Sequence, residues 1–179
     1  MIKVTNFQTV LDDAAEEVSL TLEHMLEMHD DPEAGLIKAM RYAVLEGGKR
    51  IRPFLTLTTA DLFNVKRERA LQVAAAIEMV HCYSLVHDDL PSMDDDELRR
   101  GQPTCHNKFG EATAILTGDA LLTKAFEVLS EEDTHADPKV RSELTLALAT
   151  AAGEAGMVGG QMLDLFAEDH DLKIPEITR

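Results

Sequence analysis

The chain has 179 residues, 45% of them hydrophobic, so it can bury one substantial core and is not globally disordered. Its formal charge is −16, from 33 acidic and 17 basic residues. That charge argues against a nucleic-acid partner, and an anionic substrate would need a metal ion or a local basic cluster in order to bind. Ala, Leu, Val and Met recur at helical spacing and predict an all-α protein.

Helices are predicted wherever hydrophobic residues recur every three or four positions. In chain order they cover about 7–25, 32–45, 53–62, 68–90, 112–129 and 138–166. Pro32 is suited to the first position of the second helix, and Gly47-Gly48 end it. Pro91 ends the fourth helix, and the polar stretch that follows is expected to form an ordered loop. No linker or repeat divides the chain, so residues 1–179 are expected to belong to one domain.

The cell compartment is predicted from the cysteines and the apolar runs. Cys82 and Cys105 form neither a CxxC motif nor a disulfide framework, which favours a reducing compartment. The N-terminal residues carry no long apolar core of the signal-peptide kind. No apolar run approaches the roughly 20 residues that span a bilayer. We therefore expect a cytoplasmic protein without a membrane span.

Residues 88–96 hold five carboxylates within nine positions. A charge run of this kind is often a solvated loop, but this one begins on the last turn of an apolar helix, a poor place for charges that have no function. His81, Ser84 and Asp88 share one face of that helix, and Arg99-Arg100 follow soon after. Carboxylates that hold Mg²⁺, beside two guanidinium groups, suit a diphosphate.

A second, basic element lies at residues 47–53, GGKRIRP. The glycines permit close backbone approach, and Lys49 and Arg52 lie on one side of an opening helical turn. One interpretation is a solubilising turn between helices. The other is a second anion site, purely basic, beside the metal-dependent one.

In order and spacing, GGKRIRP, HCYSLVHDDLPSMDDDELRRGQPT (81–104) and GQMLDL (160–165) resemble the trans-isoprenyl diphosphate synthases. The resemblance implies the isoprenoid-synthase helical bundle. It also implies a truncated bundle, with the chain as the N-terminal part of one polyprenyl synthetase domain. The family's second aspartate-rich motif and a later lysine are not in this chain.

The resemblance assigns the site residues. Asp88 and Asp94 match the residues that bind Mg²⁺ ions, and these ions bridge to an allylic diphosphate. Asp89 and Asp95 are weaker candidates for the same role. Arg99 matches the arginine that contacts the allylic diphosphate, so Asp88, Asp94 and Arg99 are the expected catalytic residues. The isopentenyl diphosphate pocket is matched by Lys49, Arg52, His81 and Arg100. Gln161 and Asp164 match a motif that faces the substrate cavity, and Gln161 is expected to bind substrate.

The implied activity is condensation of isopentenyl diphosphate with dimethylallyl or geranyl diphosphate, to form farnesyl diphosphate. Tyr83 and Ser84 precede the first aspartate by five and four positions, where the family lines the tunnel for the growing chain. A bulky Tyr83 favours farnesyl over geranylgeranyl diphosphate. The alternatives are a geranylgeranyl diphosphate synthase, a terpene cyclase, and a catalytically incomplete fragment or regulatory homologue. GGKRIRP and Arg100 argue against the cyclase. The resemblance also implies a homodimer.

Overall fold

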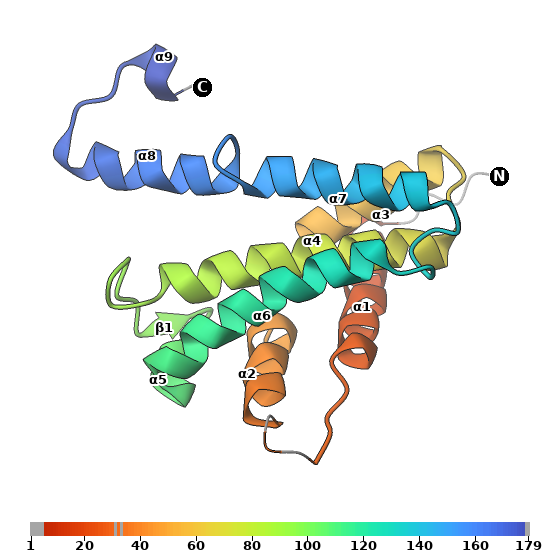
Figure 1. Ribbon diagram of the computed structural model, residues 1–179, viewed down its shortest axis with the longest axis horizontal. Helices are drawn as coiled ribbons and strands as arrows, with labels where there is room; N and C mark the ends of the chain where they lie inside the picture. The colour runs from red at the N-terminus through yellow and green to blue at the C-terminus, as the bar shows by residue number, and fades with distance from the viewer. Residues whose placement is uncertain (1–5, 31, 33, 178–179) are drawn as a thin grey trace. The chain divides into compact units, whose positions relative to one another are not determined.

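The computed structural model of the chain describes residues 6–30, 32 and 34–177, and it divides near Arg141 into two units. The first unit is helical (Figure 1) and contains α1 (Phe7–Met25), α2 (Ala34–Leu45), α3 (Ile51–Leu62), α4 (Arg67–Asp88), α5 (Cys105–Phe109) and α6 (Glu111–Ser130). Helix α7 (Pro138–Ala152) starts before the boundary, and α8 (Met157–Asp169) and α9 (Ile174–Ile177) follow in the second unit. The predicted all-α class is confirmed.

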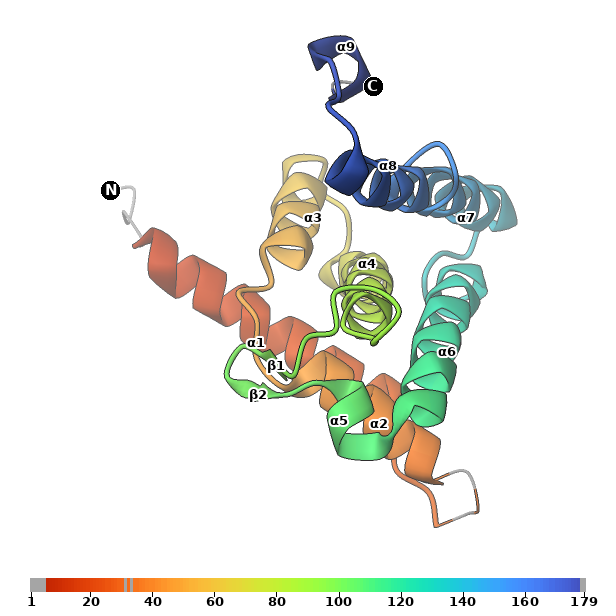
Figure 2. The same ribbon diagram turned by 90° about the vertical axis from the view of Figure 1, so that its left-hand side faces the viewer.

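Helix α4 is the centre of the first unit. It packs most extensively on α6 and α3 and also contacts α1 and α2, and Figure 2 looks along it with these helices around it. Ala74, Ala75 and Ala76 are fully buried because small side chains let neighbouring helices approach closely on several sides. The buried residues of α4 run from Ala70 to Val86, so packing holds nearly the whole helix in place. The backbone of every candidate site residue on α4 is therefore fixed relative to the neighbouring helices.

A short structure that the sequence did not predict interrupts the loop after α4. Strands β1 (Leu98–Arg99) and β2 (Gln102–Pro103) form a two-stranded antiparallel hairpin, with Arg99 opposite Gln102. Arg100 and Gly101 occupy its turn with positive φ angles. Helix α5 follows directly. The loop is ordered, as predicted, but it contains regular structure.

The predicted helix from Pro138 to Phe166 is wrong as a single element. It ends at Ala152, and α8 begins at Met157 after a turn. A Cβ added at Gly156 would lie 2.0 Å from the carbonyl oxygen of Ala151, so this turn depends on glycine. The hydrophobic spacing continues across the turn, which is why the sequence pattern conceals the break.

Two predicted helix starts also differ from the structure. Helix α2 begins at Ala34, and Pro32 lies in the preceding turn; its neighbours at 31 and 33 lie outside the described residues. Helix α3 begins at Ile51, so Pro53 is the third residue of its first turn, where a missing N–H breaks no intrahelical bond. The part of the N-terminal prediction that falls on residues 1–5 lies outside the described residues.

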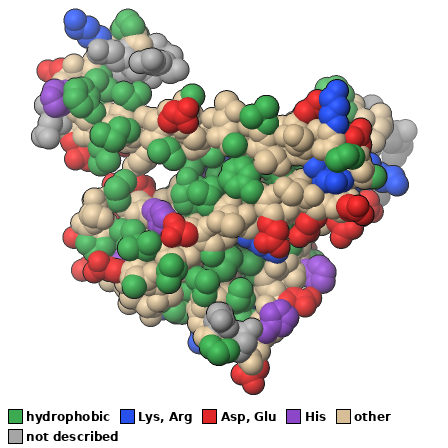
Figure 3. All heavy atoms as spheres, viewed as in Figure 1, with side chains coloured by type: hydrophobic (Ala, Val, Ile, Leu, Met, Phe, Trp, Pro, Cys, Tyr) green, Lys and Arg blue, Asp and Glu red, His purple; other side chains and the backbone are tan. Residues whose placement is uncertain are grey.

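Some hydrophobic side chains remain open to solvent, and the face drawn in Figure 3 shows several of them. Ile115 and Leu116 on α6 are 45% and 57% exposed, and Met162 on α8 is 64% exposed. Open apolar surface of this kind favours association with further protein. No helix among the described residues is long and apolar enough to cross a bilayer.

Helix α6 lies close to the His87 side chain of α4 at Gly118. A Cβ at this position would lie 2.0 Å from Nε2 of His87, and the His87 ring lies 3.0 Å from the carbonyl oxygen of Ile115. Glycine lowers helix stability relative to alanine. Its presence inside α6 is explained by the His87 ring, which leaves no room for a side chain at this position.

We therefore expect Gly118→Ala to lower the free energy of unfolding by about 1–3 kcal/mol, because the methyl group displaces the His87 ring. Urea unfolding followed by circular dichroism measures the change. In a His87→Ala background the same substitution should be neutral or stabilising. Gly160→Ala is the matched control, since nothing lies within 4 Å of its added Cβ. A stabilising Gly118→Ala in the unmodified chain would contradict this account.

Candidate functional site

Two aspartates meet at the C-terminal end of α4. Asp88 is the last residue of the helix, and the backbone N–H of Asp94 donates to the Asp88 carbonyl oxygen at 2.9 Å, which folds the loop back over the helix end. Burial, and next the negative charge of Asp94, raise the pKa of Asp88. A carboxylate in this setting gains stability from a nearby cation.

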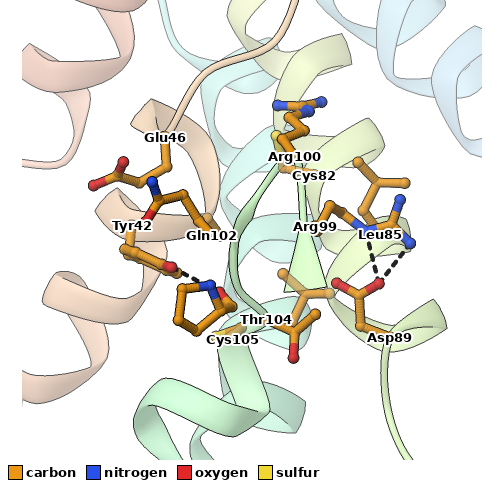
Figure 4. A pocket seen from close by; sticks show the side chains of 13 residues that line it. Tyr42, Glu46, Cys82, Leu85, Asp89, Arg99, Arg100, Gln102, Thr104 and Cys105 are labelled. Carbon is orange, nitrogen blue, oxygen red and sulfur yellow. Dashed lines mark hydrogen bonds and ion pairs between the residues drawn. The ribbon is translucent and has the colours of Figure 1, made fainter. Parts of the chain in front are cut away.

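Asp89 has a different environment. It is buried, and its Oδ1 accepts a hydrogen bond from Nε of Arg99 at 2.6 Å and lies 2.5 Å from Nη2 in an ion pair (Figure 4). Arg99 also lies 3.5 Å from Asp96. The hydrogen bond to Asp89 raises the pKa of Arg99, so the guanidinium keeps its charge. The structure thus gives Asp89 a partner within the chain; its predicted metal role stays a prediction.

The donor set at this helix end fits Mg²⁺. Among the described residues no three Asp, Glu, His or Cys side chains lie together as a complete metal cage. Mg²⁺ does not need one, because it is usually held by one or two carboxylates, with water and substrate phosphate completing its shell. Asp88 and Asp94 supply such a pair, and after burial the negative charge of Asp94 is the next cause that raises the pKa of Asp88.

A hollow at the other end of the site is lined by basic residues. Lys49, Arg52, His81 and Arg100 all line it, so the four residues predicted for the isopentenyl diphosphate pocket meet in space. They come from the segment before α3, from α3, from α4 and from the hairpin. Burial lowers the pKa of His81, and the charge of Arg52 lowers it further. Such a set is suited to bind a diphosphate.

The glycines before Lys49 make room for Arg100. Nη1 of Arg100 donates to the carbonyl oxygen of Gly47 at 2.7 Å. A Cβ at Gly48 would lie 2.5 Å from the same Nη1, and its φ of +113° is one that side chains rarely adopt. The close approach that the sequence indicated at Gly47-Gly48 is therefore an approach to Arg100.

The hairpin separates its two adjacent arginines. Arg99 points toward Asp89, whereas Arg100 points away from it (Figure 4), toward Gly47. Arg100 has a φ of 54°, a left-handed conformation that turns the chain between them. One arginine thus serves each candidate anion site.

Sequence reasoning missed two charged residues of the basic pocket, Arg50 and Glu78, which also line it. They form a buried ion pair with a distance of 2.6 Å between Nη1 and Oε1. A signal existed, because Glu78 is a single carboxylate within an otherwise apolar stretch of helix, and a buried charge requires a partner.

The remaining predicted site residues lie on α4 and α8. Tyr83 is 8% exposed, and its ring lies edge-on to that of His87 at 5.8 Å between centroids. Ser84 donates to the carbonyl oxygen of His81 at 2.8 Å. Gln161 and Asp164 lie one turn apart on α8, in the second unit.

Comparison with known proteins identifies the family. A model of the polyprenyl synthetase family matches residues 33–178. The chain belongs to this family. Both the basic segment at residues 47–53 and the aspartate run at residues 88–96 lie within the matched region.

Named relatives of the polyprenyl synthetase family agree with this assignment. Farnesyl diphosphate synthase of Escherichia coli K12 is 51% identical over 145 residues, 80% of this chain and 48% of the relative. Geranylgeranyl pyrophosphate synthase 4 of Arabidopsis thaliana is 44% identical, over 91% of this chain and 43% of the relative. An FPP/GFPP synthase from Zymomonas mobilis has a similar crystal structure, with a TM-score of 0.91, 52% identity, and coverage of 95% of this chain and 62% of that one. The chain spans about half the length of the curated relatives that it matches.

The environment of His81 gives a test of the basic pocket. We expect a pKa below the usual value of about 6.5, because burial and the nearby arginine charges oppose protonation. Since the pKa is lowered in the fold, the stabilisation by the neutral ring is present above 6.5 and is lost as the pH falls through the lowered pKa. NMR titration of the ring, assigned with His81→Gln, measures it.

Inorganic diphosphate should raise this pKa, because the bound anion offsets the positive charge around the ring. Arg52→Gln should raise it without ligand. A pKa at or above 6.5 in the free protein, unmoved by diphosphate, would contradict the description of the pocket.

Proposed function

We propose that the protein condenses isopentenyl diphosphate with an allylic diphosphate, dimethylallyl or geranyl, and releases diphosphate. The observation that carries the proposal is that α4 supplies residues to two different anion sites. His81 faces the basic pocket, and about two helical turns later Asp88 meets Asp94 at the helix end. An enzyme that joins two diphosphate esters needs one site for the ester that ionises and another for the ester that does not.

The allylic ester would bind at the acidic end of α4. Mg²⁺, held by Asp88 and Asp94, would supply charge neutralisation to the leaving diphosphate. Arg99 has five N–H donors, and its contacts with Asp89 leave others for the diphosphate oxygens. Asp89 keeps the guanidinium in one orientation, so little reorganisation is needed when charge develops on the leaving group.

Isopentenyl diphosphate would bind in the basic pocket, where Lys49, Arg52, His81 and Arg100 hold its diphosphate. The allylic C–O bond breaks and its electron pair leaves with the diphosphate. The isopentenyl double bond then attacks the allylic carbocation and forms the new C–C bond. A proton is lost from the adjacent carbon to the released diphosphate, which restores a double bond.

Farnesyl diphosphate is the proposed product. Tyr83 lies five residues before Asp88 on α4, about 7.5 Å along the helix axis, and its ring is packed against His87. A fixed aromatic ring at that distance would limit the growth of the chain. Geranylgeranyl diphosphate is the alternative, since the Arabidopsis relative carries that name at 44% identity.

We further propose that the enzyme acts in the cytoplasm as a homodimer. The buried thiols of Cys82 and Cys105 fit a reducing compartment, and burial raises their pKa values to about 12 and about 11, which makes them unreactive. The exposed Ile115 and Leu116 offer apolar surface for a second subunit.

The assay incubates the purified chain with Mg²⁺, isopentenyl diphosphate and geranyl diphosphate, with EDTA as control, and sizes the products by chromatography. If the protein continues past Arg179, the full-length form is assayed in parallel. We expect metal-dependent farnesyl diphosphate from the full-length form. Asp88→Asn should lower kcat by about 100-fold or more, since it removes charge where the leaving group is neutralised.

Asp133→Asn makes the same chemical change at an exposed turn after α6 and is the matched control. It should leave activity unchanged. Activity of the full-length form alone would make the 179-residue chain an incomplete fragment. No product from either form would overturn the proposed function, and equal loss in both variants would separate Asp88 from the chemistry.

The product length should depend on Tyr83. We expect Tyr83→Ala to shift the product from farnesyl to geranylgeranyl diphosphate or longer, because the small side chain opens space beside His87. Tyr83→Phe retains the ring and should retain the product. The product distribution of each variant is read by mass spectrometry, and an unchanged product from Tyr83→Ala would remove the residue from the length argument.

A further inference from the structure

One ion pair in the wall of the basic pocket is almost completely buried. The side chains of Arg50 and Glu78 are 2% and 3% exposed, and Nη1 lies 2.6 Å from Oε1. The second terminal nitrogen of Arg50 donates to the backbone carbonyl oxygen of Val44. All other ion pairs found among the described residues have at least one partner that is about a quarter exposed or more.

Stability alone does not explain this pair. Taking both charges out of water costs several kcal/mol per ion, and a well-packed apolar pair of similar volume is often equally stable or more so. Removing only one partner is strongly unfavourable because it leaves an uncompensated buried charge. A function in holding a particular local arrangement is the physical alternative, and the location of the pair indicates which arrangement that is.

Arg50 joins three helices at the point where the pocket residues are held. It is the residue before α3 and has a left-handed φ of 50°. Its guanidinium contacts Val44 at the end of α2 and Glu78 in the middle of α4. Lys49 precedes it and Arg52 follows it by two positions, and both of these side chains are exposed in the pocket.

Glu78 is linked to the pocket from the other side. It lies three residues before His81 on α4, so the two side chains share a face of the helix. The Arg50 backbone is thereby held against the helix that carries His81. The strained φ at Arg50 would relax without this contact, and Lys49 and Arg52 would move with it.

The pair also sets the sign of the charge in the pocket. Both members line it, together with the four cationic or titratable groups that face the substrate. Because Glu78 neutralises Arg50, the positive charge presented to a diphosphate comes from the exposed residues. An unpaired Glu78 would repel the diphosphate, and an unpaired Arg50 would be drawn toward it and away from Val44.

We propose that Arg50 and Glu78 are positioning residues, whose buried ion pair holds Lys49, Arg52 and His81 in the geometry that binds the isopentenyl diphosphate group. This inference rests on the proposed function for the identity of the ligand. It does not involve Asp88, Asp94 or Arg99, so the allylic site should not depend on the pair.

The test uses the protein at its full length and steady-state kinetics with each substrate varied in turn. Glu78→Gln should raise KM for isopentenyl diphosphate by about tenfold or more, since small displacements of positioned groups have effects of this order. KM for geranyl diphosphate should change less than about twofold. The double variant Arg50→Gln with Glu78→Gln should lose less than the product of the two single losses, because neither charge is left unpaired.

Glu17→Gln is the matched control. Glu17 pairs with Arg67 at the start of the same helix α4, at 2.9 Å, but far along the chain from the pocket residues. It should leave both KM values unchanged. Arg50→Lys provides a milder variant, if Glu78→Gln does not fold, because it keeps the charge but cannot bridge Glu78 and Val44 together; it should raise the same KM.

Calorimetric titration with inorganic diphosphate separates this inference from the proposed function. Weaker binding to Glu78→Gln than to the unmodified protein would support the positioning role even without turnover. Normal turnover with no selective change in the isopentenyl KM would overturn it while the proposed function stands. Equal rises in both KM values, or no diphosphate binding by the unmodified protein, would overturn it as well.

Discussion

The burial of α4 among its neighbours is the constraint on which both candidate anion sites depend. A helix packed by α1, α2, α3 and α6 has little freedom to shift or rotate, so His81 and Asp88 are held in a constant relation. Charges on such a helix are unfavourable unless they are compensated. Glu78 is paired with Arg50, whereas Asp88 lies beside a second carboxylate, Asp94, whose charge adds to burial in raising the pKa of Asp88. This grouping of carboxylates is what makes the helix end suited to a cation.

The β1–β2 hairpin connects the two sites because Arg99, at the end of β1, and Arg100, in the turn, direct their side chains to different partners. Arg99 is fixed to Asp89, beside the aspartate pair, and Arg100 is fixed to Gly47, beside the basic pocket. Two adjacent residues therefore take part in different sites. A shift of the turn by one residue would take Arg100 out of its left-handed position and redirect its side chain, so the register of the hairpin is important. The left-handed conformation of Arg100 and the adjacent Gly101 fix that register.

The sequence predicted much of this arrangement, and the misses have physical reasons. Hydrophobic spacing located most helices, and GGKRIRP and the aspartate run located residues that the structure brings into one pocket and one helix end. The break at Gly156 was missed because the apolar pattern runs through it, while the close approach of the Ala151 carbonyl is a property of the backbone alone. The pairing of Asp89 with Arg99 was missed because two adjacent aspartates look alike in sequence. Only their side-chain directions at the helix end distinguish the one that is buried.

The net charge of −16 makes the local arrangement decisive. The average field of the protein repels diphosphates, but at physiological ionic strength it is screened over about 8 Å. Within that range a diphosphate would meet Lys49, Arg52 and Arg100, or the aspartate pair together with a cation that this pair would hold. A carboxylate exposed among the basic residues would cancel much of this attraction. Because Glu78 is buried and paired with Arg50, it does not cancel the charge of the exposed basic residues. An acidic protein can therefore keep a cationic pocket.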